Sequence, residues 1–91
     1  MKVKNPCIGS ICESLQGRDK GTSYVIVGIL PNSFVLVADG NRKKLGSPKR
    51  KNLKHLHILP QNVGDYGVEI SEKANDCQIA YALKLSRKAK A

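Results

Sequence analysis

The positively charged side chains of this chain are unevenly spread, and they are the residues best suited to chemistry with a partner. No acidic residue occurs between Asp39 and Asp65. The lysines and arginines within this interval are Arg42, Lys43, Lys44, Lys49, Arg50, Lys51 and Lys54. Cations clustered without acids attract phosphate groups, and the whole chain carries a formal net charge of +9. We therefore expect a phosphate-binding face here, against the alternative of a charged surface that only aids solubility.

A second source of cations is the short segment bounded by Gly17 and Gly21. Both glycines can adopt positive φ without steric cost, so they favour a sharp loop between two strands. Arg18 and Lys20 would then be exposed at the tip of this loop. Asp19 between them is expected to turn inward and accept hydrogen bonds from backbone N–H groups. The segment predicts a rigid strand–loop–strand unit with two cations at its corner.

Residues that could support catalysis are present, but they lack recognisable partners. Ser10 and Ser14 have no histidine and acid placed to activate them. Asp65 and Glu69 could form a carboxylate pair, but they lie in a predicted loop without a pocket pattern. We therefore expect no enzyme activity and no cofactor.

The three cysteines, Cys7, Cys12 and Cys77, are an odd number in a chain without a recognisable secretion signal. This favours free thiols in a reducing, cytosolic compartment. A zinc site built from Cys7, Cys12, His55 and His57 is conceivable, but the spacings fit the usual zinc motifs poorly. We expect no bound metal, and we expect Cys12 and Cys77 to be small buried apolar residues.

The elements that must position these residues are short strands, as the apolar runs and turn signals indicate. They are predicted within residues 7–15 and at 22–30, 33–38, 42–45 or slightly beyond, and 53–59. Asp39-Gly40 is a strong hairpin signal, Pro60 is expected to stop the last strand, and residues 49–51 are expected in a loop. Five such strands favour a small curled barrel, which removes exposed sheet edges.

Alternation within the second predicted strand assigns Val25, Val27 and Ile29 to one face, opposite Tyr24. Gly28 interrupts the strand and predicts a bend or a close approach by another backbone.

The few aromatic residues bear on the kind of partner. Tyr24 and Phe34 fall in predicted strands, where they are expected to serve the core, and Tyr66 is expected to be a packing lid. No aromatic platform for reading single strands is then evident. Recognition of backbone and shape remains, and it suits a structured RNA.

One helix is predicted near the end of the chain, with Asn75 or Asp76 as its N-cap. Ile79, Ala80 and Leu83 would form the apolar stripe that packs on the barrel. The basic residues at its far end are Lys84, Arg87, Lys88 and Lys90. They are expected to be solvated, with RNA contact as the alternative. The predicted layout is a lead-in at 1–7, a barrel at 8–60, and a loop, helix and basic tail at 61–91.

Several of these segments resemble known proteins. The stretch Ile8–Ser14, the loop Gly17–Gly21 and the apolar strand after it resemble a KOW motif, the strand–loop–strand unit of RNA-binding SH3-like barrels. The segments Phe34–Gly40 (FVLVADG) and Pro48–Leu56 (PKRKNLKHL) are similar to the fourteen-e family of large-subunit ribosomal proteins and its small bacterial relatives. The similarity covers roughly residues 8–59.

This resemblance implies a mainly β fold, an SH3-like barrel, with ribosomal or related RNA as the partner. It suggests contacts from the Arg18 and Lys20 loop and from the segment 49–55. The resemblance and the interval without acidic residues together give the set of predicted RNA-binding residues. These are Arg18, Lys20, Arg42, Lys43, Lys44, Lys49, Arg50, Lys51, Lys54 and His55. The alternative is an interaction or transcription/translation accessory module that binds an acidic protein surface. We expect a cytoplasmic protein, monomeric when free, with no membrane partner.

Overall fold

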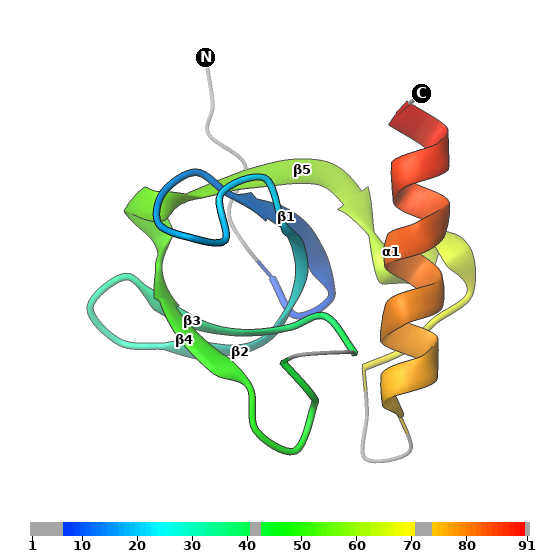
Figure 1. Cartoon of the computed structure of the whole chain (residues 1–91). Helices are drawn as coiled ribbons and strands as arrows, with labels where there is room; N and C mark the ends of the chain where they lie inside the picture. Colours follow the sequence, from blue (N-terminus) through cyan, green and yellow to red (C-terminus); the bar gives the residue numbers. More distant parts are fainter. Residues whose placement is uncertain (1–6, 41–42, 71–73, 91) are drawn as a thin grey trace.

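Five strands, two short 3-10 helices and one α-helix form within residues 7–40, 43–70 and 74–90, which the computed structural model describes (Figure 1). The strands are β1 (Ser10–Ser14), β2 (Ser23–Leu30), β3 (Phe34–Ala38), β4 (Lys49–Asn52) and β5 (Leu56–Asn62). The helices are η1 (Leu53–His55), η2 (Val63–Tyr66) and α1 (Asp76–Lys90).

The strands form one antiparallel sheet in the order β4-β3-β2-β1-β5. The sheet curls strongly, so that Figure 1 looks along the axis of a small barrel with α1 packed beside it. The predicted fold, a five-stranded SH3-like barrel followed by a helix, is confirmed.

The apolar side chains form two clusters because successive residues of a strand point to opposite faces. The cluster inside the barrel contains Cys12, Tyr24, Ile26, Val35, Val37 and Leu56. The second cluster joins the outer face of β1, β2 and β5 to α1 and contains Ile11, Val25, Leu59, Val63, Val68, Ile79, Ala82 and Leu83. A chain of this size thus buries apolar surface in two places, and the helix completes the second.

An irregularity in β2 confirms the expected bend at Gly28. The pairing of β2 with β3 shifts register between Ile26 and Gly28. A Cβ atom added at Gly28 would lie 3.0 Å from Leu36 Cδ1, so the group that approaches this glycine is a side chain and not another backbone. The shift also pairs Ile29 with Val35, so that Ile29 no longer shares a face with Val25. The Ile29 side chain is 49% exposed. The expectation that Ile29 shares the face of Val25 was therefore wrong.

The helix begins where the sequence predicts. Asn75 Oδ1 accepts a hydrogen bond from Gln78 N at 2.9 Å, and the Gln78 side chain accepts one from Asn75 N at 3.2 Å. Ile79 and Leu83 are buried as expected, but Ala80 is exposed and Ala82 is buried instead. The position after Ile79 turns away from the face on which positions three and four residues later lie. Within the described ranges, none of the helices has the length and apolar character that a membrane span requires.

The predicted fourth strand at residues 42–45 was wrong. Arg42 lies outside the described residues, and residues 43–48 form turns. Lys43 N donates to Asp39 Oδ1 at 2.9 Å, and Leu45 N donates to Asp76 Oδ1 at 2.8 Å. These bonds hold the segment against the start of α1 and out of the sheet. The fourth strand is instead β4, over residues that were expected in a loop.

The predicted fifth strand was displaced by three residues. Residues 53–55 form η1, capped by the Asn52 side chain, which accepts from Lys54 N at 2.9 Å. β5 then continues through Pro60 to Asn62. Proline is tolerated because β5 is an edge strand whose pairing with β1 shifts register between Ser10 and Cys12.

Candidate nucleic-acid interface

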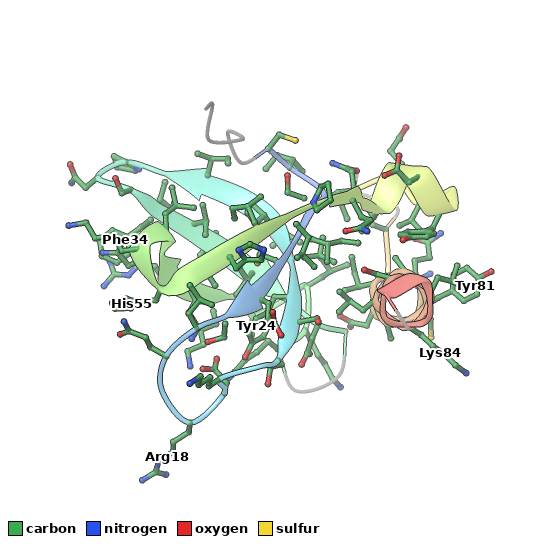
Figure 2. The ribbon with its side chains drawn as sticks, turned by 90° about the horizontal axis from the view of Figure 1, so that it is seen from above. Arg18, Tyr24, Phe34, His55, Tyr81 and Lys84 are labelled. Atoms are coloured by element: carbon green, nitrogen blue, oxygen red, sulfur yellow. The ribbon has the colours of Figure 1, made fainter. Side chains whose placement is uncertain are left out.

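The loop between β1 and β2 has the sharp shape that its glycines predict. Gly17 and Gly21 both have φ of +88°. Lys20 N donates to Gly17 O at 3.2 Å, and Gly21 N donates to Ser14 O at 2.8 Å, which closes the loop on itself. Arg18 and Lys20 are exposed, and Figure 2 shows Arg18 pointing away from the barrel.

Asp19 turns inward as expected, but its carboxylate accepts hydrogen bonds from side chains instead of from the backbone. Its Oδ1 accepts from Ser14 Oγ at 2.9 Å, and its Oδ2 accepts from Tyr24 OH at 2.7 Å. Lys51 Nζ lies 3.0 Å from Oδ1 and 2.7 Å from Oδ2. Burial by itself would raise the pKa of Asp19, but the bonds from its three donors and the Lys51 charge outweigh it and hold the pKa well below its usual value. The negative charge of Asp19 at the loop tip is therefore balanced by Lys51, and its carboxylate connects the loop to β2 and β4.

The basic triplet of β4 is divided between the two faces of the sheet. Lys49 pairs with Val37 and Lys51 with Val35, so both share the inner face with the barrel core. Arg50 pairs with Leu36 on the opposite face. The Lys51 side chain is only 10% exposed, whereas that of Lys49 is 42% exposed and its Nζ lies 3.9 Å from Asp19 Oδ2. The three cations therefore do not form one continuous patch on a loop.

The loop and β4 enclose a cleft of about 440 Å³ at one end of the barrel. Its lining consists of Gly17, Arg18, Asp19, Thr22, Tyr24, Asp39, Lys43, Lys49 and Lys51. Cations from three separate segments thus converge here, namely Arg18, Lys43 and Lys49, while Lys51 is held by Asp19. Phosphate oxygens are the groups that such a set of cations attracts most strongly.

No protein-family model matches the chain. It is 38% identical over 79 residues to the large ribosomal subunit protein eL14 of Sulfolobus acidocaldarius, an alignment that covers 87% of this chain and 77% of that protein. It is 38% identical over 77 residues to eL14 of Metallosphaera sedula, covering 85% and 75%. The eL14 protein of Saccharolobus islandicus (strain L.S.2.15) is 33% identical over 72 residues, covering 79% and 70%.

The chain belongs to the eL14 family. This is the fourteen-e family that the sequence motifs resemble, and the suspected resemblance is confirmed. The relatives are named as ribosomal proteins, and none of these names describes an enzyme.

Other predicted contacts of the eL14-family chain lie outside the cleft lining. Lys20 and Lys44 are exposed on the segments that flank the cleft. Lys54 and His55 are exposed in η1, which directly follows β4. The structure thus brings four predicted residues to one cleft and puts two beyond the end of β4.

The aromatic residues differ from expectation at one position. Tyr24 is buried and Tyr66 packs against the helix cluster, as expected. Phe34 is only half-buried on the outer face, where Arg50 Cζ lies 4.9 Å from the centre of its ring. The alternation of residues 34–38 could have revealed this, since Val35 and Val37 occupy the inner face. Tyr81, 55% exposed on α1, was also missed although it lies off the apolar stripe (Figure 2).

The cysteines are free thiols in different surroundings. Cys12 is buried as expected, and Cys7 is exposed. Cys77 is exposed on α1, so the expectation that it is buried was wrong. Burial raises the pKa of the Cys12 thiol to about 12, and the charge of Lys51 lowers it only in part. In the described part of the chain, no group of three or more histidine, cysteine or acidic side chains is arranged to hold a metal.

These surroundings predict selective thiol labelling. In the folded protein at pH 8, we expect Cys7 and Cys77 to react readily with iodoacetamide and Cys12 to react roughly 100-fold more slowly, because a buried neutral thiol is a poor nucleophile. Peptide mass spectrometry after timed labelling measures the three rates, and unfolding in urea should equalise them. Comparable rates for all three cysteines in the native protein would contradict the burial of Cys12.

Proposed function

We propose that this eL14-family chain is a large-subunit ribosomal protein that binds ribosomal RNA through the face around its cleft. The observation that carries the proposal is the convergence of Arg18, Lys43 and Lys49 from three segments on one cleft. The family supports the choice of RNA, because the similar proteins are named large ribosomal subunit proteins. The compartment proposed with this function is the cytoplasm.

The role proposed for each cation follows from its surroundings. Exposed Arg18 and Lys49 are proposed as phosphate contacts at the cleft. Lys51 is proposed to act indirectly, because its ammonium is occupied by Asp19 and its side chain is mostly buried. Lys43 is proposed as a further phosphate contact at the cleft. The residues proposed to extend the contact on either side are Lys20, Lys44, Lys54 and His55.

A salt series with matched lysine variants tests this proposal. Lys49→Ala is expected to weaken binding of transcribed large-subunit ribosomal RNA about three- to tenfold and to lower the slope of log K against log salt by somewhat under one unit, because one set of counterions is no longer released. Lys84→Ala removes the same charge from an exposed position on α1 (Figure 2) and is expected to change both quantities less. Fluorescence anisotropy between 50 and 300 mM KCl measures both.

The result that would overturn the proposed face is an equal or larger loss for Lys84→Ala, with both variants folded. An acidic polypeptide, polyglutamate, added as competitor distinguishes the alternative function. If it displaced the RNA at equal charge concentration, the cleft would be a general anion site and a protein partner would become the better proposal.

A further inference from the structure

Phe34 and Arg50 form a cation–π pair on the outside of the barrel. Phe34 and Leu36 point outward from β3 because Val35 and Val37 point into the core. Arg50 lies opposite Leu36 in the ladder, so it shares this outer face and its guanidinium covers the Phe34 ring at 4.9 Å. Arg50 is an exposed residue, and it makes no ion pair with any residue that the structure describes. A planar cation therefore lies over an aromatic ring on an exposed residue.

The surroundings hold this pair in place and add charge beside it. Phe34 follows a tight turn in which Asn32 and Ser33 both have positive φ, 62° and 67°. Ser33 O accepts a hydrogen bond from Leu53 N at 2.9 Å, which ties the turn to η1. The same short helix carries the exposed Lys54 and His55, and Figure 2 shows Phe34 and His55 at the end of the molecule away from α1.

The strand that carries Arg50 connects this pair to the cleft. β4 is at the edge of the sheet, and its neighbouring residues Lys49 and Arg50 face opposite sides of it. One RNA segment that passes over this edge can meet the cleft cations on one side and the Phe34–Arg50 pair on the other. Proteins stack unpaired bases on aromatic rings and on the planar guanidinium groups of arginines. Such stacking requires the flat shape of the guanidinium, whereas a phosphate contact requires only a positive charge.

We propose that Phe34 and Arg50 form a stacking platform for one unpaired nucleobase, which lies on the open face of the Arg50 guanidinium. This rests on the proposed RNA-binding function and specifies its target as a helix that carries a bulged or looped-out base next to the bound backbone. Arg50 is thereby assigned to base stacking, and the exposed Lys54 of η1, which directly follows β4, is assigned to the phosphate of that nucleotide.

Two RNA duplexes of about 16 base pairs, identical except for one bulged 2-aminopurine, test this proposal. The wild-type protein is expected to bind the bulged duplex about tenfold more tightly than the paired one, and to change the 2-aminopurine fluorescence. Arg50→Lys keeps the charge and removes the plane, so binding to the paired duplex should persist while the preference disappears. Phe34→Leu keeps apolar bulk and removes the ring, and it should lose the preference too.

Lys49→Ala is the matched control on the same strand, and it should weaken binding of both duplexes equally and leave the preference intact. Equal affinity of the wild-type protein for the two duplexes would overturn the platform alone, as would a full preference in Arg50→Lys. Failure to bind either duplex would overturn the proposed function and the platform with it. The urea midpoint of each variant shows whether it is folded. If Phe34→Leu is unfolded, the preference of Arg50→Lys for the bulged duplex decides whether the platform exists.

Discussion

Replacing Asp19 with asparagine is expected to lower the free energy of unfolding by about 3 kcal/mol, a large share of the stability of a small domain. Asparagine keeps the shape of the side chain but removes the charge that holds Lys51, whose side chain is only 10% exposed. The ammonium would then be left mostly buried without its counter-ion, and Tyr24 and Ser14 would lose a charged acceptor. Urea unfolding followed by circular dichroism measures the loss.

A double-mutant cycle separates the ion pair from the rest of the network. The double variant, Asp19→Asn with Lys51→Met, should lose less stability than the sum of the two single variants, by about 2 kcal/mol, because each single variant leaves a buried charge unpaired and the double variant leaves none. Glu69→Gln removes an acid from an exposed position and should change stability by less than about 0.5 kcal/mol. Additive losses in the cycle would show that Asp19 and Lys51 do not stabilise each other.

The same carboxylate predicts how stability depends on pH. The pKa of Asp19 in the folded protein lies well below its ordinary value, since the bonds and charge around it outweigh the effect of burial. Its contribution is therefore fully present above about pH 4, the unfolded value, and is lost as the pH falls towards the folded value. The difference in stability between wild type and Asp19→Asn should accordingly shrink below pH 4.

Replacing Gly40 with alanine is expected to cost about 3 kcal/mol or more, because it would force the helix away from the barrel. A Cβ atom at Gly40 would lie 2.2 Å from the Asp76 carbonyl oxygen and 2.9 Å from Ala80 N, both backbone atoms that cannot rotate aside. The φ of Gly40 is also +77°, which disfavours any side chain. Displacement of α1 would expose Ile79 and Leu83, which are buried against the outer face of the sheet.

Gly21→Ala is the matched control for this effect. Gly21 has φ of +88°, but an added Cβ would meet no atom within 4 Å, so only the backbone penalty of about 1 kcal/mol remains. Urea unfolding of both variants gives the difference, which isolates the cost of separating helix and sheet. A loss for Gly40→Ala no larger than that for Gly21→Ala would contradict the close packing of this turn on α1.

The features predicted correctly from sequence are those that depend on near neighbours in the chain. The loop between Gly17 and Gly21 needs positive φ at two glycines, and those glycines have it. The start of α1 follows from the pairing of Asn75 with Gln78, three residues apart. The segments that resemble the fourteen-e family, Phe34–Gly40 and Pro48–Leu56, are likewise continuous stretches of the chain, and so the family was accessible from the residues alone.

The sequence by itself determined the barrel, the loop and the helix, because period-two alternation, glycine conformations and helix caps are local properties of the chain. Only the tertiary structure decided where β4 lies and what its cations do. The backbone N–H of Leu45 donates to Asp76, 31 residues away, which holds this segment outside the sheet. The Lys51 ammonium donates to Asp19, 32 residues away. Contacts at such separations leave no periodic signal, so Lys49, Arg50 and Lys51 look equivalent in the sequence. Strand pairing then turns Lys49 to the cleft, Arg50 to Phe34 and Lys51 to its counter-ion.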